Sequence, residues 1–166
     1  MSDDAIRDLM NKDVEEEIVG TQYLTFVLDN EIYGIKILAV QEILAWESAT
    51  RVPNSPHYVK GVLNLRGTIV PVFDMRVRFN FPEAEYNKET VVIVVQIKRE
   101  KGEQSIGLIV DGVSDVLNVV DEEIGVTPEF GAGVPTENIK GLVSRDNKMV
   151  MLLDTDSLAI EEQQVV

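Results

Sequence analysis

The sequence predicts an all-β protein with short helices, in which two small β-barrel lobes lie side by side with a groove between them. Short runs of β-branched and aromatic residues recur along the chain, and the second half repeats the first. Half of a 166-residue chain is too small to bury a good core alone, so the halves should pack together. We expect a flexible acidic tail over residues 1–20, a folded domain over 21–158 with intertwined lobes at roughly 21–89 and 90–158, and a C-terminal tail over 159–166.

The first half begins with a predicted hairpin. Residues 23–28 and 32–35 are strand-like, and the polar triplet Asp29-Asn30-Glu31 between them is typical of a turn. The stretch ILAVQEIL follows. Its apolar residues recur at helical spacing, which predicts a short helix over residues 37–44.

A second hairpin forms the centre of this half. Residues 60–65 and 68–73 are apolar strands that meet at Arg66-Gly67, where glycine can adopt the positive φ of a tight turn. Asp74 then predicts the N-cap of a short helix, because its carboxylate can accept hydrogen bonds from free backbone N–H groups.

The second half has the same order of predicted elements. Strands are predicted over residues 91–97 and 105–110, and a charged turn over 98–103 connects them. Residues 113–117 match the pattern of 40–44, and residues 139–154 repeat 59–74.

Counting supports the repeat. Lys60 precedes Asp74 by 74 − 60 = 14 positions, and Lys140 precedes Asp154 by 154 − 140 = 14, an offset of 80 between the copies. VQEIL at 40–44 lies over VSDVL at 113–117 at offset 73, which Gly34 and Gly107 share.

The copies differ at the hairpin tip. Arg66 in the first copy corresponds to Asp146 in the second, so the hairpin itself does not require arginine. Arginine is enriched at interface anchors, since it combines a flat apolar face with five hydrogen-bond donors. Arg66 is therefore a candidate to clamp a partner helix in the groove between the lobes.

Composition excludes several classes of protein. The net charge of −14 argues against binding to nucleic acid or anionic lipid and favours basic or apolar protein surfaces as partners. Seven acids against two basic residues in the first 20 positions place −5 of that charge in the tail. There is no cysteine, signal peptide or membrane-length apolar run, so we expect a cytoplasmic protein without direct membrane insertion.

The sequence offers no catalytic constellation, so we predict that the protein is not an enzyme and uses no cofactor or metal. The single histidine, His57, lies in a loop, and no phosphate-binding glycine motif occurs. The acidic clusters at 15–17 and 121–123 lack the glycine turn of a calcium loop, and acids at the start of a helix explain the second cluster. Asp154 aligns with Asp74 and predicts a helix cap.

Two alternatives to a protein-binding role remain open. A groove lined by valine and isoleucine with one arginine could bind a small carboxylate, which would make the chain a small-molecule sensor. An oligonucleotide-binding barrel needs exposed aromatic and basic strands, and the acidic composition disfavours it.

The run VKGVLNLRGTIVPVFDMRVRF at 59–79 resembles the signature segment of the CheW family of chemotaxis coupling proteins. EIYGIKILAVQEIL at 31–44, GLIVDGVSDVL at 107–117 and TPEF at 127–130 are also similar to this family. The resemblance covers about residues 23–158, and it implies two five-stranded β-barrel subdomains packed around a shared hydrophobic core.

The resemblance implies a non-catalytic adaptor. Members of the family couple the helical cytoplasmic tips of methyl-accepting chemoreceptors to the regulatory domain of the histidine kinase CheA. The chain would then be a monomer when free, would be recruited to membrane-associated chemoreceptor arrays, and would assemble into rings there.

The resemblance also assigns site residues by matching position. The receptor groove would have Arg66 as its polar anchor, and its members are Val40, Glu42, Ile43, Arg66, Val91, Val113 and Val116. The kinase contacts would involve Gly61 and Val62 at one barrel end, and Glu129 and Phe130 at the ring-closing contact. The turn at 98–103 looks like an insertion that could alter partner geometry.

Overall fold

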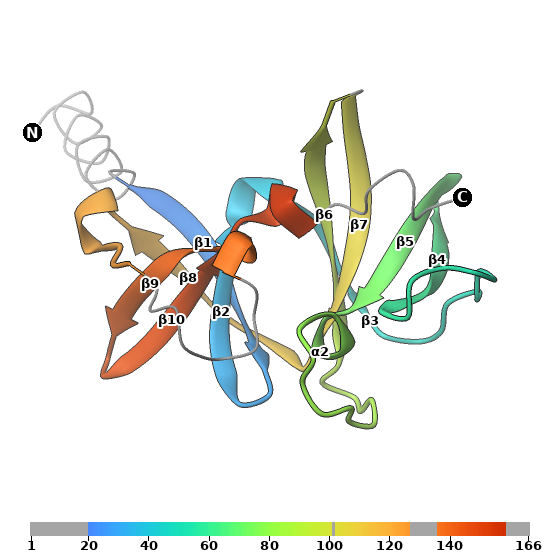
Figure 1. Cartoon of the computed structure of the whole chain (residues 1–166), viewed down its shortest axis with the longest axis horizontal. Coiled ribbons are helices and arrows are strands. Elements are labelled where there is room, and N and C mark those ends of the chain that lie inside the picture. Colours follow the sequence, from blue (N-terminus) through green and yellow to red (C-terminus); the bar gives the residue numbers. More distant parts are fainter. Residues whose placement is uncertain (1–19, 101, 127–135, 159–166) are drawn as a thin grey trace, which may run out of the picture.

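The computed structural model describes residues 20–100, 102–126 and 136–158 and consists mainly of β-strands (Figure 1). Apart from Gly20, the predicted tails lie outside the described residues. The strands are β1 (Thr21–Leu28), β2 (Glu31–Lys36), β3 (Val40–Ala45), β4 (Val59–Leu65), β5 (Thr68–Asp74), β6 (Val91–Arg99), β7 (Gly102–Val110), β8 (Gly112–Val119), β9 (Ile139–Arg145) and β10 (Lys148–Leu153). The helical elements are α2 (Met75–Arg78) and the 3-10 turns η1 (Ile37–Ala39), η2 (Asp121–Glu123), η3 (Thr136–Asn138) and η4 (Thr155–Leu158).

The strands form two five-stranded curled sheets that make two adjacent lobes (Figure 1). Sheet 1 has the order β8-β1-β2-β10-β9, and sheet 2 has the order β3-β6-β7-β5-β4. This confirms the predicted all-β class with two five-stranded lobes. Within the described part of the chain, no helix has the length and apolar character needed to cross a bilayer.

Each sheet combines strands from both copies of the repeat. Sheet 1 takes β1 and β2 from the first copy and β8 to β10 from the second, and sheet 2 takes β3 to β5 from the first and β6 and β7 from the second. Strands that are equivalent in the repeat differ by five in number, and they occupy equivalent places in the two sheets. The boundary predicted between 21–89 and 90–158 therefore does not divide the sheets. The physical reason is that β2 with β10 and β7 with β5 pair in parallel, which strands joined by a short turn cannot do.

Equivalent glycines mark the two parallel pairings. Gly34 of β2 lies opposite Leu152, and Gly107 of β7 lies opposite Val72, so the pairs are related by the two offsets found in the sequence. A Cβ at Gly107 would lie 2.8 Å from Val92 Cγ1, and one at Gly34 would lie 3.1 Å from Leu152 Cδ2. Close side-chain packing over the pairing explains why glycine occupies both places.

The largest core lies between the two sheets. Phe26 and Tyr33 of sheet 1 pack in one fully buried cluster with Phe73, Ile93 and Leu108 of sheet 2. Each large apolar side chain buried this way contributes about 1.5–3 kcal/mol. Smaller clusters around Tyr23 and around Val72 fill the individual lobes. The shared hydrophobic core is therefore as predicted.

The helix predicted over residues 37–44 is wrong. The structure has the single 3-10 turn η1 followed by strand β3, whose residues alternate between half-buried and exposed. β3 pairs with β6, and Ile43 lies opposite Ile93. The sequence of residues 40–45 fits both a helical spacing and a strand-like alternation of apolar residues. Pairing with β6 selects the strand. Residues 113–117, which share the pattern, are also strand.

The charged turn predicted over residues 98–103 is also mostly wrong. β6 and β7 extend through it, with Lys98 opposite Glu103 and Arg99 opposite Gly102. Solvent-exposed charges are compatible with strand pairing because opposite charges face each other across the ladder. By contrast, the predicted cap at Asp74 is confirmed, since its side chain accepts hydrogen bonds from the Arg76 and Val77 N–H groups. Asp154 likewise accepts from the Asp156 N–H at 3.2 Å.

Candidate partner-binding surface

Arg66 lies in a strained position at the hairpin tip. Its φ is 51° and that of Gly67 is 89°, the pair of positive values that suits a two-residue hairpin turn. The other such turns use Asp29-Asn30 and Asp146-Asn147, which tolerate this conformation at lower cost than arginine. The Asn64 side chain accepts a hydrogen bond from the Gly67 N–H at 2.9 Å and so supports the turn. The arginine is therefore not what the turn needs.

The Arg66 guanidinium forms a bidentate ion pair with Glu42. Its two terminal nitrogens lie 3.1 and 3.0 Å from the two carboxylate oxygens. Glu42 is on β3 and Arg66 is on the β4–β5 hairpin, so the pair connects opposite ends of the strand order of sheet 2. The Arg66 side chain is still 80% exposed, against 28% for Glu42. The paired arginine remains accessible to a partner.

Large apolar side chains are exposed on the two equivalent edge strands. Ile43 on β3 is 44% exposed, and Val113 and Val116 on β8 are 38% and 46% exposed. Strands β3 and β8 are the first strands in the orders of sheet 2 and sheet 1. Val40, also predicted for this site, is half-buried and packs against the shared core.

Val91 connects these edges. It pairs with Ala45 of β3, and it lines a surface hollow of about 590 Å³ together with Val113 of β8. The hollow lies where strands of the two sheets meet, and Val27, Ile109, Asp111 and Gly112 also line it. The structure therefore brings Val91 and Val113 together, pairs Arg66 with Glu42, and leaves Ile43 and Val116 exposed on the same two edge strands.

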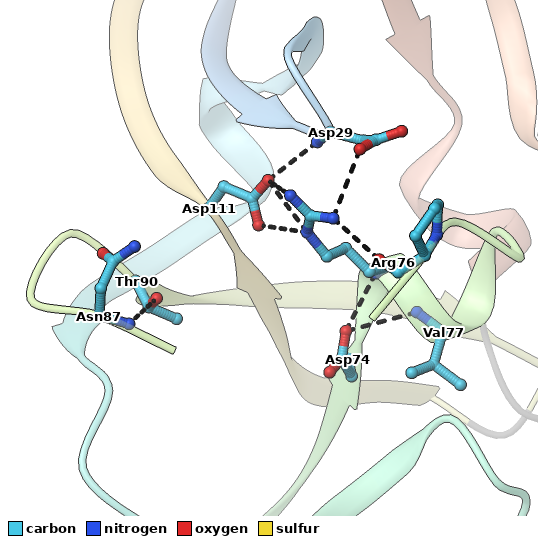
Figure 2. A network of polar contacts seen from close by, with 8 residues as sticks. Asp29, Asp74, Arg76, Val77, Asn87, Thr90 and Asp111 are labelled. Atoms are coloured by element: carbon cyan, nitrogen blue, oxygen red, sulfur yellow. Dashed lines mark hydrogen bonds and ion pairs between the residues drawn. The ribbon is translucent and has the colours of Figure 1, made fainter. Parts of the chain in front are cut away.

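A polar network at this hollow was not predicted from the sequence (Figure 2). Arg76 donates through Nε to Asp111 Oδ1 at 2.8 Å and through Nη2 to Asp111 Oδ2 at 2.7 Å. Its third nitrogen donates to the Pro82 carbonyl at 2.8 Å and lies 3.4 Å from Asp29 Oδ1. The hydrogen bonds to Asp111 raise the pKa of Arg76 above its ordinary value. The D-x-R in the signature run was the available signal, because it places Arg76 two residues after the capping aspartate.

Asp74 links this network to the wall of the hollow. One carboxylate oxygen caps α2, and the other accepts a hydrogen bond from the Tyr86 hydroxyl at 2.5 Å. Burial, and then the bond to Asp74, raise the pKa of Tyr86 far above its ordinary value, so the hydroxyl remains a donor. The segment that carries Tyr86 is thereby held against β5.

The residues predicted to contact the kinase differ in burial, and two of them lie outside the described residues. Gly61 is buried, and a Cβ there would overlap the Thr50 carbonyl oxygen, with which the Val62 N–H forms a 2.8 Å hydrogen bond. Gly61 thus has a packing role, and half-buried Val62 is the more accessible of the two. Glu129 and Phe130 lie outside the described residues.

The described residues contain no group of three or more histidine, aspartate or glutamate side chains placed to hold a metal ion. The His57 ring packs edge-on against Tyr58 with centroids 5.9 Å apart. The surface is therefore described best by its exposed apolar strands and its ion pairs.

Comparison with known proteins agrees with this description. Residues 22–163 match the CheW-like domain family. The chain is 43% identical over 150 residues to the chemotaxis protein CheW of Klebsiella aerogenes, covering 90% of this chain and 88% of the relative. It is 33% identical over 143 residues to that of Bacillus subtilis, covering 86% and 89%. Its fold is similar to the crystal structure of the scaffolding protein TtCheW from Thermoanaerobacter tengcongensis, with a TM-score of 0.77, 28% identity and coverage of 88% and 92%. The chain therefore belongs to the CheW-like family of chemotaxis proteins.

Proposed function

We propose that this chain is a non-catalytic chemotaxis adaptor that binds the helical cytoplasmic tips of chemoreceptors and the regulatory domain of the histidine kinase CheA. Family membership supports the chemotaxis role, and a solved relative is named a scaffolding protein. In this proposal the chain is recruited to receptor arrays at the membrane and joins rings there.

The observation that carries the receptor contact is the apolar surface on β3 and β8. Ile43, Val113 and Val116 are exposed there although large apolar side chains usually gain by burial. A partner helix that presents an apolar face would cover them, and carboxylates or free carbonyls on that helix would reach Arg66.

The kinase contacts are proposed at two places. One is the surface around Val62 on β4, next to buried Gly61 and opposite Pro71 of β5; Ile69, two residues before Pro71, is 60% exposed. The other, at Glu129 and Phe130, would close rings.

The small-molecule sensor has no comparable support. More acidic than basic residues line the hollow, namely Asp74, Glu85, Glu89 and Asp111 against Arg76 and Lys88, which disfavours a carboxylate ligand there. The relatives matched over most of the chain are chemotaxis proteins.

Co-sedimentation with receptor-bearing membranes, with and without CheA, tests the proposal. The wild type should pellet with the receptors, and Arg66→Asn should lose receptor-dependent pelleting but retain binding to CheA. Asp146→Asn is the matched control, because it changes the equivalent turn residue of the second copy, which also has a φ of 51°. A wild-type protein that pellets with neither partner would overturn the proposal.

A further inference from the structure

Arg76 connects three parts of the chain that meet between the lobes. It extends from α2, which follows β5 of sheet 2, to Asp29 in the β1–β2 turn of sheet 1 and to Asp111, which lies between β7 and β8. Asp111 also accepts a hydrogen bond from the Asp29 N–H at 2.8 Å, and its own N–H donates to the Val27 carbonyl. Figure 2 shows the Asp29 and Asp111 carboxylates converging on the Arg76 guanidinium. The Arg76 side chain is 17% exposed, and those of Asp111 and Asp29 are 30% and 37% exposed, so solvent screens these ion pairs only in part.

At the equivalent junction on the other side of the molecule, the described residues form no such network. At offset 80, Arg76 corresponds to Asp156, whose carboxylate accepts one hydrogen bond from the Lys98 N–H at 2.9 Å. At offset 73, Asp111 corresponds to Leu38, which is 94% exposed. Among the described residues, this second junction thus has one backbone-to-carboxylate hydrogen bond, whereas the first has the ion-paired cluster of Arg76, Asp111 and Asp29, which we call the clamp.

The clamp lies at the hollow of the candidate partner-binding surface. Arg76 and Asp111 line this hollow together with Val91 of sheet 2 and Val113 of sheet 1. Asp111 immediately precedes β8, the strand that carries Val113 and Val116. A change in the angle between the lobes here would alter the spacing of Val91 and Val113.

We propose that Arg76 is a positioning residue for partner binding: by holding Asp111 and Asp29, it fixes the angle between the lobes and so the spacing of the apolar residues that a receptor helix covers. The inference rests on the proposed receptor contact. It predicts that receptor binding depends on Arg76 although the guanidinium itself need not touch the receptor.

Two measurements separate this role from a purely structural one. The chain has no cysteine, so Thr68→Cys and Lys148→Cys can carry spin labels at equivalent exposed hairpin positions, one in each lobe. The distance distribution between the labels, from double electron–electron resonance, reports the angle between the lobes. Affinities for a soluble receptor cytoplasmic fragment and for the CheA regulatory domain are measured on unlabelled protein.

The variants are Arg76→Ala and Arg76→Lys. Lysine keeps the positive charge on a side chain of similar length, but its ammonium group cannot form the bidentate contact with Asp111. Arg145→Ala is the matched control, because Arg145 makes its contacts within one lobe, to Glu123 at 2.7 Å and to the Asn118 carbonyl of β8 at 2.7 Å, and none of these residues lines the hollow. For both Arg76 variants we expect a broadened or shifted distribution and a 3- to 30-fold weaker receptor affinity, about the range by which positioning residues modulate coupling. Affinity for CheA should stay within about twofold, as for a distant site.

Weaker receptor binding with an unchanged distance distribution would overturn the proposal and make Arg76 a direct contact. A changed distribution with unchanged receptor affinity would overturn it as well. If Arg76→Ala does not fold, Arg76→Lys still decides. If the wild type fails to bind the receptor fragment, the proposed function fails, and the distance measurement still shows separately whether Arg76 sets the lobe angle.

Discussion

Arg66 and Glu42 join the hairpin β4–β5 to strand β3 through two parallel hydrogen bonds of 3.1 and 3.0 Å, across the opposite ends of sheet 2. Arginine pays a conformational cost at this turn, and the ion pair offsets part of that cost. Arg66 is less suited to this conformation than the aspartates and asparagines of the equivalent turns, and its ion pair with Glu42 lies outside the turn, on the proposed partner-binding surface.

Replacing Arg66 with asparagine should leave the free energy of unfolding almost unchanged. Asparagine relieves a left-handed conformation that costs other residues about 1 kcal/mol, while loss of an exposed ion pair costs about 0–1 kcal/mol. The two effects oppose each other, so we expect a net change within about 0.5 kcal/mol by urea denaturation. A loss above about 2 kcal/mol would instead give Arg66 a structural role.

The coupling between Arg66 and Glu42 should be small and sensitive to salt. A double-mutant cycle with Arg66→Asn and Glu42→Gln should give about 0.2–1 kcal/mol, because the Arg66 side chain is 80% exposed. Raising the salt concentration should reduce this value. A coupling that persists unchanged in 1 M salt would contradict an ion pair screened by solvent.

Gly61→Ala should destabilise the fold rather than remove one partner contact. The added Cβ would meet the Thr50 carbonyl and disrupt the two backbone hydrogen bonds between Thr50 and Val62. We expect a loss of about 1–3 kcal/mol from overpacking. Gly141→Ala, which meets Ile124 and the Gly125 carbonyl at the equivalent place, should cost a similar amount. Selective loss of CheA binding by Gly61→Ala at an unchanged melting temperature would favour the direct contact.

The Glu123 carboxylate should contribute stability that disappears in acid. The Val120 N–H and then Arg145 lower the pKa of Glu123 below its ordinary value of 4.5. A lowered pKa in the folded state means that the stabilisation is fully present above pH 4.5 and is lost as the pH falls through the folded value. Because solvent screens this pair, Glu123→Gln should cost about 0.5 kcal/mol at pH 7.

Thermal unfolding of the wild type and of Glu123→Gln between pH 7 and pH 3 measures this contribution. The two melting curves should converge in acid. Glu122→Gln serves as the control for removing one surface carboxylate. A difference that grows as the pH falls would show that the sign is wrong.

Part of the candidate surface could be predicted from the sequence. The mismatch between Arg66 and Asp146 within the repeat made Arg66 a candidate, and resemblance by position made Val113 and Val116 candidates; all three side chains are exposed in the structure. Arg76 was missed although it stands in the signature run. Its partners Asp29 and Asp111 are 47 and 35 residues away, and no local pattern connects residues at such separations.

Local chemistry in the chain determines the hairpins, the positive φ at Gly67, the cap at Asp74 and the repeat, because each depends on residues close together along the backbone. Tertiary structure decides whether residues 40–45 form a helix or a strand, and which copy of the repeat supplies each strand of a sheet. Residues 40–45 satisfy both a helical and an alternating pattern, and only pairing with β6 selects the strand. Likewise, the parallel pairs β2–β10 and β5–β7 exist only when both copies fold together, since the energy that selects them comes from contacts between distant segments.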